Sequence, residues 1–349
     1  MATQRSSASG VAPQVVGISL AAAMGGFLFG FDTSVINGAI DAMSEDFAIS
    51  GFMQGFAVSS ALLGCVAGAW FSGPLAARFG RVKVMLVAAV LFLVSAIGSG
   101  LAFGVIDLIV WRVLGGLAVG AASVIAPAYI AEVAPAQVRG RLGSLQQLAI
   151  VLGIFAALLS DAFLAGQAGG AAETLWLGRE AWRWMFMAEA VPAVLYGALA
   201  LAIPESPRFL VDKGRVQEAT RILRDYTKVK DTAAKIDEIT RSLARESAES
   251  LRDLRGASFG LKPIMWVMLG EMFPNTIRAT AVAVASAFNW LANFTVSTTL
   301  PVLSETSLTL AYGLYAAFAL ISFFFVLRAV PETTGRELED MSEQARGAG

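Results

Sequence analysis

An all-α membrane protein is the fold class that this sequence predicts, and three observations support the prediction. Hydrophobic residues make up 56% of the 349 residues, charged residues make up only 15%, and the mean hydropathy is +0.66. A chain that faces water over its whole surface needs more polar residues than this. Several apolar runs also reach the roughly 20 residues that a helix needs to cross a bilayer. We therefore expect a bundle of transmembrane helices.

A polar segment divides the apolar runs of the chain into two groups. Six apolar runs come first, at residues 15–38, 53–72, 84–103, 106–131, 143–166 and 184–203. Residues 204–258 are polar and contain helical patterns at 216–226 and 233–248, so they are expected to form a soluble helical linker. A shorter apolar piece follows at 259–274, and two more full runs lie at 278–303 and 310–330. The sequence thus predicts eight full spans and one short stub.

The positive charges predict the orientation of these spans. They cluster after the second span (Arg78, Arg81, Lys83), after the fourth (Arg139, Arg141) and in the linker. The opposite loops are mainly acidic, with Asp41, Glu45, Asp46, Glu173, Glu180 and Glu305. Lysine and arginine accumulate in cytoplasmic loops. We therefore expect a multi-pass protein of the cell (inner) membrane whose two termini and linker lie in the cytoplasm.

Composition also excludes several kinds of chemistry. The chain has no histidine, which excludes Ser-His-Asp hydrolysis, metal ligation by histidine and histidine proton relays. Its single cysteine, Cys65, cannot form an intrachain disulfide. The net charge of −1 gives no case for nucleic acid as a partner. We see no nucleophile and base pair, phosphate loop or metal cluster, so an enzyme, a metal site and a cofactor are not expected.

One carboxylate stands out, because Asp32 lies inside the first apolar run. A charge at the centre of a membrane helix costs about 2.5–3.5 kcal/mol on insertion scales, so it is rarely tolerated without a task such as carrying a proton. Asp32 therefore points to ion-coupled transport.

The loop between the second and third spans carries a motif that suits a gate. Residues 73–83 read Gly-Pro-Leu-Ala-Ala-Arg-Phe-Gly-Arg-Val-Lys. Glycines allow a tight turn and a close approach of helices, and arginines can bridge to carboxylates and helix C-termini. The motif resembles the cytoplasmic signature of the major facilitator superfamily. The alternative interpretation is ordinary anchoring by positive charge on the cytoplasmic side.

Six further motifs resemble those of the sugar porter family within that superfamily. They read Pro-Ala-Tyr-Ile-Ala-Glu-Val-Ala-Pro at 127–135, Arg-Gly-Arg at 139–141, Pro-Glu-Ser-Pro-Arg at 204–208, Gly-Glu-Met-Phe-Pro at 270–274, Asn-Trp-Leu-Ala-Asn-Phe at 289–294 and Pro-Glu-Thr-Thr-Gly at 331–335. The resemblance covers nearly the whole chain. It implies a helical bundle of the major facilitator type and transport of a monosaccharide, a hexose or pentose, by alternating access, as in proton-linked symporters.

The resemblance breaks after the linker. The family has two bundles of six helices, with the linker between helices six and seven, whereas only two full spans follow the linker here. Helices seven to nine and part of ten are missing, and the expected join lies within 263–267. We therefore divide the chain into a cytoplasmic N-terminus (1–14), a complete six-helix bundle (15–203), the linker (204–258), a truncated C-terminal bundle (259–330) and a cytoplasmic tail (331–349).

The resemblance also implies roles for individual residues. Asp32, Arg112 and Glu189 match positions that couple transport to protons, although a static buried ion pair is the alternative. Amides and aromatic rings suit sugars because hydroxyl groups bond to amides and sugar C–H faces stack on rings; such groups also serve as contacts between helices or with lipid. The implied sugar contacts are Phe29, Gln146, Gln147, Trp266, Asn289 and Trp290.

The implied gate combines the motif of 73–83 with two carboxylates at span ends. Glu132 and Glu271 each stand before a proline and an arginine at the cytoplasmic end of a span, as an internal duplication predicts. Capping of the helix end is the alternative role for each. The implied gating residues are Gly73, Arg78, Gly80, Arg81, Glu132, Arg141, Glu271 and Arg278.

Two classes of function remain open at this point. The first is a carrier that moves a monosaccharide with a proton across the lipid bilayer. The second is a non-transporting remnant, or a sensor-like membrane protein that binds sugar. The missing part of the second bundle distinguishes them, because alternating access needs two bodies around one site. The sequence does not identify a protein partner.

The predicted topology can be tested by cysteine labelling. Of the 26 lysines and arginines, only Arg112, Arg179 and Arg183 lie outside the side that we assign to the cytoplasm. A Ser242→Cys variant should therefore resist a membrane-impermeant maleimide in intact cells and react after permeabilisation, with the unsubstituted chain as the control for Cys65. Labelling of Ser242→Cys in sealed cells would contradict the topology.

Overall fold

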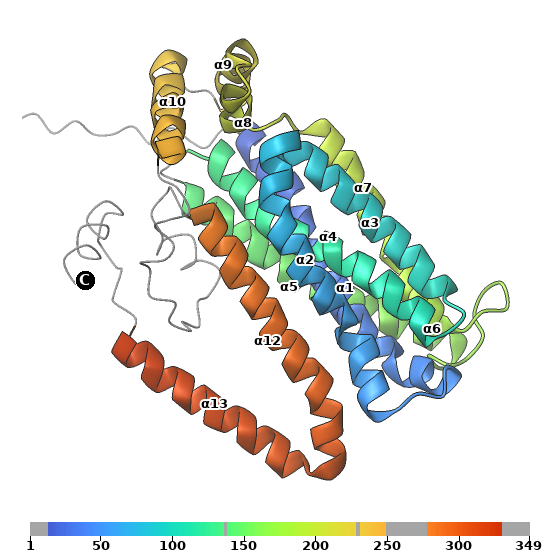
Figure 1. The fold of residues 1–349 in the computed structure, drawn as a ribbon. Coiled ribbons are helices and arrows are strands. Elements are labelled where there is room, and N and C mark those ends of the chain that lie inside the picture. Colours follow the sequence, from blue (N-terminus) through green and yellow to red (C-terminus); the bar gives the residue numbers. More distant parts are fainter. Residues whose placement is uncertain (1–12, 136–137, 228–230, 249–277, 330–349) are drawn as a thin grey trace, which may run out of the picture.

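The computed structural model describes residues 13–135, 138–227, 231–248 and 278–329. Within these ranges the chain is helical, with no regular strand and only one isolated bridge between Thr174 and Glu180. Six long apolar helices are long and hydrophobic enough to cross a membrane. They lie side by side in one bundle, and the linker helices cover one end of it (Figure 1). The chain is therefore an all-α, multi-pass membrane protein.

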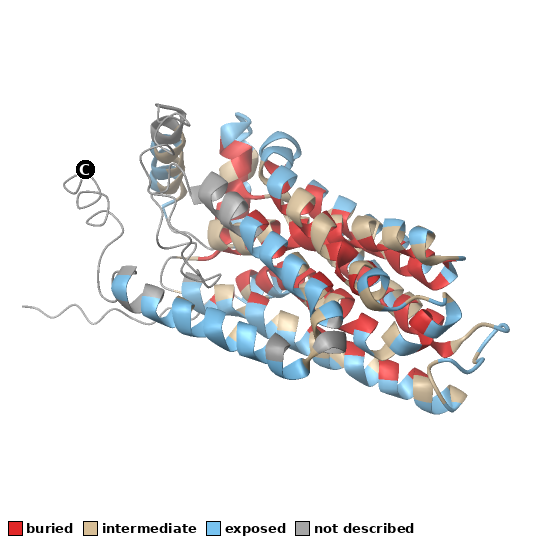
Figure 2. Cartoon of the chain, turned by 60° about the horizontal axis from the view of Figure 1, so that its bottom comes forward, coloured by how far each residue is buried: buried red, intermediate tan, exposed pale blue. Residues whose placement is uncertain are grey.

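The bundle contains α1 to α7. The bounds are Pro13–Asp46 (α1), Gly51–Phe79 (α2), Arg81–Leu101 (α3), Val105–Val133 (α4), Arg139–Ala168 (α5), Ala181–Ala188 (α6) and Ala190–Ala202 (α7). Helices α6 and α7 together form the sixth span. Figure 2 shows buried residues concentrated where these helices face one another. Several helices extend beyond the predicted spans, because a helix does not have to end where the hydrocarbon ends.

Glycines let the helices of the bundle approach closely. A Cβ atom on Gly116 of α4 would collide with the carbonyl oxygen of Ala61 in α2, and one on Gly153 of α5 would collide with that of Phe27 in α1. Membrane helices associate through such small residues, because lipid is as apolar as leucine and gives no hydrophobic drive. The α1, α2, α4 and α5 interfaces that surround the buried charges described below are therefore dense.

The linker forms three short helices. They are α8 (Pro207–Asp212), α9 (Val216–Asp225) and α10 (Thr232–Ala248). Helix α8 begins with Pro207, whose missing N–H is not needed in a first turn, and the hydroxyl of Ser206 accepts a hydrogen bond from the Phe209 amide. Apolar residues of the three helices pack into a small core of their own. The three helices lie within residues 204–258, the range predicted for the linker.

Within the described part of the chain, two helices follow the linker, α12 (Arg278–Thr306) and α13 (Leu308–Ala329), close to the ranges predicted for the last two spans. Helix α12 lies along α2, where Thr298 and Ser59 share a hydrogen bond of 2.6 Å and Phe294 meets Phe56 edge to face. Helix α13 packs mainly on α12 and leans away from the bundle (Figure 1). The stub predicted at 259–274 lies outside the described residues.

Candidate functional site

The centre of the bundle holds a buried ion pair. Asp32 of α1 and Arg112 of α4 are 1% and 2% exposed, and Arg112 Nη1 donates to Asp32 Oδ1 at 2.9 Å. The same nitrogen donates to the backbone carbonyl of Asp32 at 3.3 Å. The guanidinium also lies over the Phe186 ring, 5.6 Å from its centre. Removing one partner of such a pair would leave the other charge unpaired in the apolar interface between α1 and α4.

Glu189 adds a second carboxylate to this pair. It is 1% exposed and lies between α6 and α7, within hydrogen-bonding reach of the Asp32 carboxyl. The break between the two helices has a local cause: Pro192 has no N–H to donate to the carbonyl of Ala188, and its ring crowds that carbonyl. The proline thus interrupts the sixth span at the residue that carries the buried carboxylate.

The three residues, called the buried charge cluster below, leave bonding capacity unused. Among the described residues, Asp32 Oδ2, Glu189 Oε1 and Arg112 Nε have no hydrogen-bond partner. The cluster holds two carboxylates and one guanidinium, so in its fully ionised form it carries one excess negative charge in a dry interior. A proton bound between Asp32 and Glu189 would remove that charge and turn one carboxyl into a donor for the other. The arrangement is chemically suited to take up and release one proton.

The predicted sugar contacts are partly brought together. Phe29 of α1 and Trp290 of α12 meet edge to face, with ring centres 5.2 Å apart. Gln146 is buried, Gly26 leaves the space for its side chain, and its amide has no hydrogen-bond partner within the described part of the chain. Gln147 and Asn289 are exposed. Trp266 lies outside the described residues.

A second cluster, called the linker-end cluster below, lies at the end of the bundle that meets the linker, where part of the predicted gate is assembled. Arg81 of α3 pairs with Glu132 of α4 at 2.8 Å, and the Ser206 hydroxyl donates to the same Glu132 carboxylate. Glu205 accepts hydrogen bonds from the backbone N–H groups of Arg81 (3.0 Å) and Val82 (3.2 Å). A carboxylate in this position satisfies free amides at the N-terminus of α3 and complements its dipole.

Gly80 makes this arrangement possible. Its N–H donates to Ala76 and ends α2, while its carbonyl accepts from Val84 in the first turn of α3. Its φ of +100° favours glycine, and a Cβ atom there would collide with the Glu205 carboxylate. The turn therefore requires glycine for both its backbone and its space.

Other predicted gating residues do not join this linker-end cluster. Arg78 is exposed and lies over the ring of Phe79, Arg141 is exposed, and no atom outside the local helix lies within 4 Å of a Cβ built on Gly73. Glu271 and the side chain of Arg278 lie outside what the structure describes. Glu205 and Ser206 were not among the predicted gating residues, although they belong to the Pro-Glu-Ser-Pro-Arg motif at 204–208. That motif was the available signal.

The opposite end of the bundle is held by Arg183. Its guanidinium donates to Asp46 at 2.7 Å, to Glu180 at 2.6 Å and to the carbonyl of Ala102. Burial raises the pKa of Glu180, but the backbone hydrogen bond and the Arg183 guanidinium more than offset this, so the pKa lies below its ordinary value. Arg183 thus ties the end of α1 to α3 and α6.

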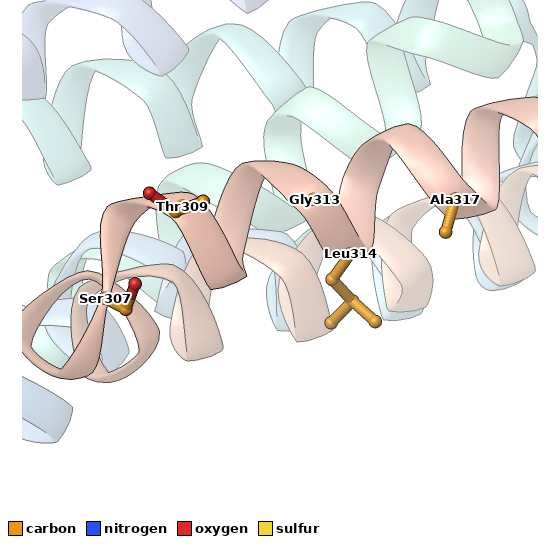
Figure 3. Close-up of a pocket in the computed structure, with 5 residues that line it drawn as sticks. All are labelled: Ser307, Thr309, Gly313, Leu314 and Ala317. Carbon is orange, nitrogen blue, oxygen red and sulfur yellow. The ribbon is translucent and has the colours of Figure 1, made fainter.

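A further hollow lies where α12 turns into α13 (Figure 3). Its lining is small or apolar, and it includes none of the predicted site residues. The lining residues are Ser307, Thr309, Gly313, Leu314 and Ala317. It does not contribute to the candidate site.

The chain is similar in sequence and in fold to known sugar transporters. The family model described as "Sugar (and other) transporter" matches residues 18–259 and 254–345. A glucose transport protein from Synechocystis is 41% identical, with 93% of this chain and 96% of the relative covered. The D-xylose-proton symporter of Escherichia coli K12 is 29% identical, with 94% and 95% covered. The inward open structure of the E. coli xylose transporter XylE has a TM-score of 0.78 and 28% identity and covers 95% of this chain and 99% of that one.

The comparisons also bear on the missing helices. The alignment with the Synechocystis protein runs over 452 positions, more than the 349 residues of this chain. The family model matches in two pieces that meet at residues 254–259. Relatives therefore contain an internal segment that this chain lacks, as the motif order predicted, and the family-model pieces meet slightly before the expected join at 263–267.

The linker-end cluster yields a test with a matched control. We expect Gly80→Ala to lower the free energy of unfolding by about 1–2 kcal/mol, because an L-residue is strained at this φ. Its new Cβ atom would also push against Glu205. Gly73→Ala, in the same motif but with open space around its Cβ position, should be neutral or slightly stabilising. Thermal unfolding of both variants in detergent measures the difference, and equal shifts would contradict the role of Gly80.

Proposed function

The chain belongs to the sugar transporter family, and on this premise we propose that it binds a monosaccharide, a hexose or pentose, together with a proton and serves sugar:proton symport by alternating access. Members of the family are transporters rather than enzymes. Two relatives are named as a D-xylose-proton symporter and an arabinose-proton symporter, which supports the proposal that the coupled ion is a proton. Another is named as a glucose transport protein, which supports a monosaccharide as the substrate.

The buried charge cluster is the observation that carries the proposal. With the proton bound, Asp32 and Glu189 together bear one negative charge, which Arg112 balances. Without the proton, the excess negative charge favours either the entry of water into the cluster or a rearrangement of α1, α4 and the α6–α7 break. Proton binding and helix packing are therefore linked, because the packed dry state is more stable with the proton than without it.

The proposed sugar site adjoins this cluster on α1 and α5. The Gln146 amide offers a donor and an acceptor to sugar hydroxyls, and the edge-to-face corner of Phe29 and Trp290 offers an apolar wall. Gln147 and Asn289 are exposed and available as further hydrogen-bonding groups. We include Trp266 only because the family resemblance implies a sugar contact at this position.

We further propose that the linker-end cluster faces the cytoplasm and acts as the inner gate. Glu132 and Glu205 connect the ends of α3 and α4 to the start of the linker through Arg81 and Ser206. Opening the bundle at this end requires those charge-assisted hydrogen bonds to separate, so the cluster favours the closed form. Both termini and the linker are placed in the cytoplasm on the basis of their positive charges.

A second candidate function rests on the incomplete second bundle. Only α12 and α13 follow the linker within the described residues, and α12 packs on α2. The side of the site near Gln147 is exposed, so it has no facing wall from the described helices. This observation favours a chain that binds sugar and protons but moves sugar poorly.

Uptake into liposomes distinguishes the two functions. We expect the purified chain to accumulate labelled xylose or glucose only weakly under an inward proton gradient, because alternating access needs two bodies that seal the site in turn. The E. coli D-xylose-proton symporter serves as the positive control. Robust gradient-driven accumulation would show that the remaining helices, or a second copy of the chain, complete the site.

The role of Asp32 can be tested in a chain that regains the missing helices, inserted from the Synechocystis relative near residues 254–259. Asp32→Asn should abolish accumulation driven by acid outside, while downhill sugar exchange persists, because the amide cannot bind and release the proton. Asp41→Asn, on an exposed turn of the same helix, is the control. Unchanged accumulation in Asp32→Asn would reduce Asp32 to a structural residue.

A further inference from the structure

A second buried carboxylate lies outside the buried charge cluster. Asp161 of α5 is 4% exposed, and neither of its side-chain oxygens has a hydrogen-bond partner among the described residues. No Lys or Arg in the described part of the chain forms an ion pair with it. A buried carboxylate without hydrogen bonds costs free energy unless water, a proton or a cation binds to it.

Asp161 lines a cavity of about 250 Å³ between α1, α5 and α6. The other lining residues are Asn37, Gly38, Leu158, Ala162, Ala165 and Met185. Gly38 lets α1 approach the carboxylate, because a Cβ atom there would lie 2.6 Å from Asp161 Oδ2. Gly38 is six residues beyond Asp32, about 9 Å along the helix at 1.5 Å per residue, so the cavity lies nearer to the C-terminal end of α1.

The surroundings of Asp161 are rich in acceptors and acidic groups. The Nδ2 atom of Asn37 donates to the carbonyl of Ser34, so the amide oxygen remains as an acceptor. Asn37, Asp41 and Glu45 are exposed at intervals of four residues, which puts them on one face of α1. The charged groups at this end of the elements packed against α5 are Asp41, Glu45 and Asp46 on α1, Asp107 on α4, and Glu173, Arg179, Glu180 and Arg183 before and within α6.

The cations among these groups do not reach Asp161 as partners. Arg183 is occupied by Asp46 and Glu180, and Arg112 by Asp32. The acidic face of α1 attracts cations and protons toward the cavity. Asp161 and the Asn37 amide together offer at most three oxygens, fewer than the six or more that calcium takes. A proton needs only one oxygen, and a cavity of this size has room for water, at roughly 30 Å³ per molecule, to deliver it.

We propose that Asp161 is a proton-binding carboxyl separate from the buried charge cluster, which takes its proton from water on the side of the acidic face of α1. The proton adds to one carboxylate oxygen, and its release returns it to the same water. The neutral acid tolerates a dry cavity, whereas the carboxylate requires water, so the hydration of the α1–α5 seam follows proton binding. This inference concerns proton binding by the isolated chain and does not rest on sugar transport.

Infrared difference spectroscopy of the purified full chain tests the proposal. The chain is titrated in a maltoside detergent, which has no carbonyl group, between roughly pH 5 and 8, where exposed carboxylates are ionised. We expect a carboxylic-acid C=O band that Asp161→Asn removes and that Asp32→Asn and Asp41→Asn retain. An Asp161→Asn spectrum that superimposes on the wild-type spectrum would overturn the proposal.

Two further arms identify the ligand and guard against misfolding. Sodium chloride added at fixed pH should leave the Asp161 band unchanged relative to choline chloride. Loss of the band in sodium alone would assign the site to a metal cation and reject the proton. Where Asp161→Asn fails a thermal unfolding check, Asp161→Glu replaces it and should keep an acid band at a shifted frequency. A folded Asp161→Glu chain with the wild-type band unshifted would also contradict the proposal.

Discussion

The ion pair between Asp32 and Arg112 is the constraint on which the rest of the structure depends. An unpaired charge in a membrane helix costs about 2.5–3.5 kcal/mol on insertion scales, so each residue is tolerated because the other is present. The pair fixes the rotation of α1 against α4, since both side chains must point into the same interface. With α1 and α4 fixed in this way, Glu189 meets the pair from the sixth span, and three separate helices converge on one charge cluster.

Close packing gives that charge cluster its dry surroundings. Gly116 and Gly153 bring α4 onto α2 and α5 onto α1 with backbone contacts, which leaves little room for water between the helices. The same density makes protonation consequential, because a buried group that changes charge must either move or change its neighbours. The proline-induced break at Glu189 supplies one place where such a movement is easy, since a hydrogen bond of the helix is already missing there.

The two ends of the bundle are closed by different means. At the end that meets the linker, Arg81, Glu132 and Glu205 tie the helices to the linker through charge-assisted hydrogen bonds. At the other end, Arg183 connects α1, α3 and α6. The first bundle is therefore held at both ends by its own residues and those of the linker, whereas α13 depends mainly on α12 for contact. Helices α12 and α13 are the described helices that follow the point at which relatives contain a segment that this chain lacks.

The sequence alone determined the helical membrane fold, the six apolar helices of the bundle and the presence of a charge inside the first of them, Asp32, because hydrocarbon thickness and the cost of a buried charge are visible in composition and run length. It also marked residues 204–208 by motif. Only the tertiary structure decided that Gln146 is buried while Gln147 is exposed, since adjacent residues of a helix point about 100° apart and the sequence does not fix the rotation. It likewise decided that Glu205 caps α3 and that Asp161 has no hydrogen-bond partner among the described residues, because both depend on which side chains of distant segments meet.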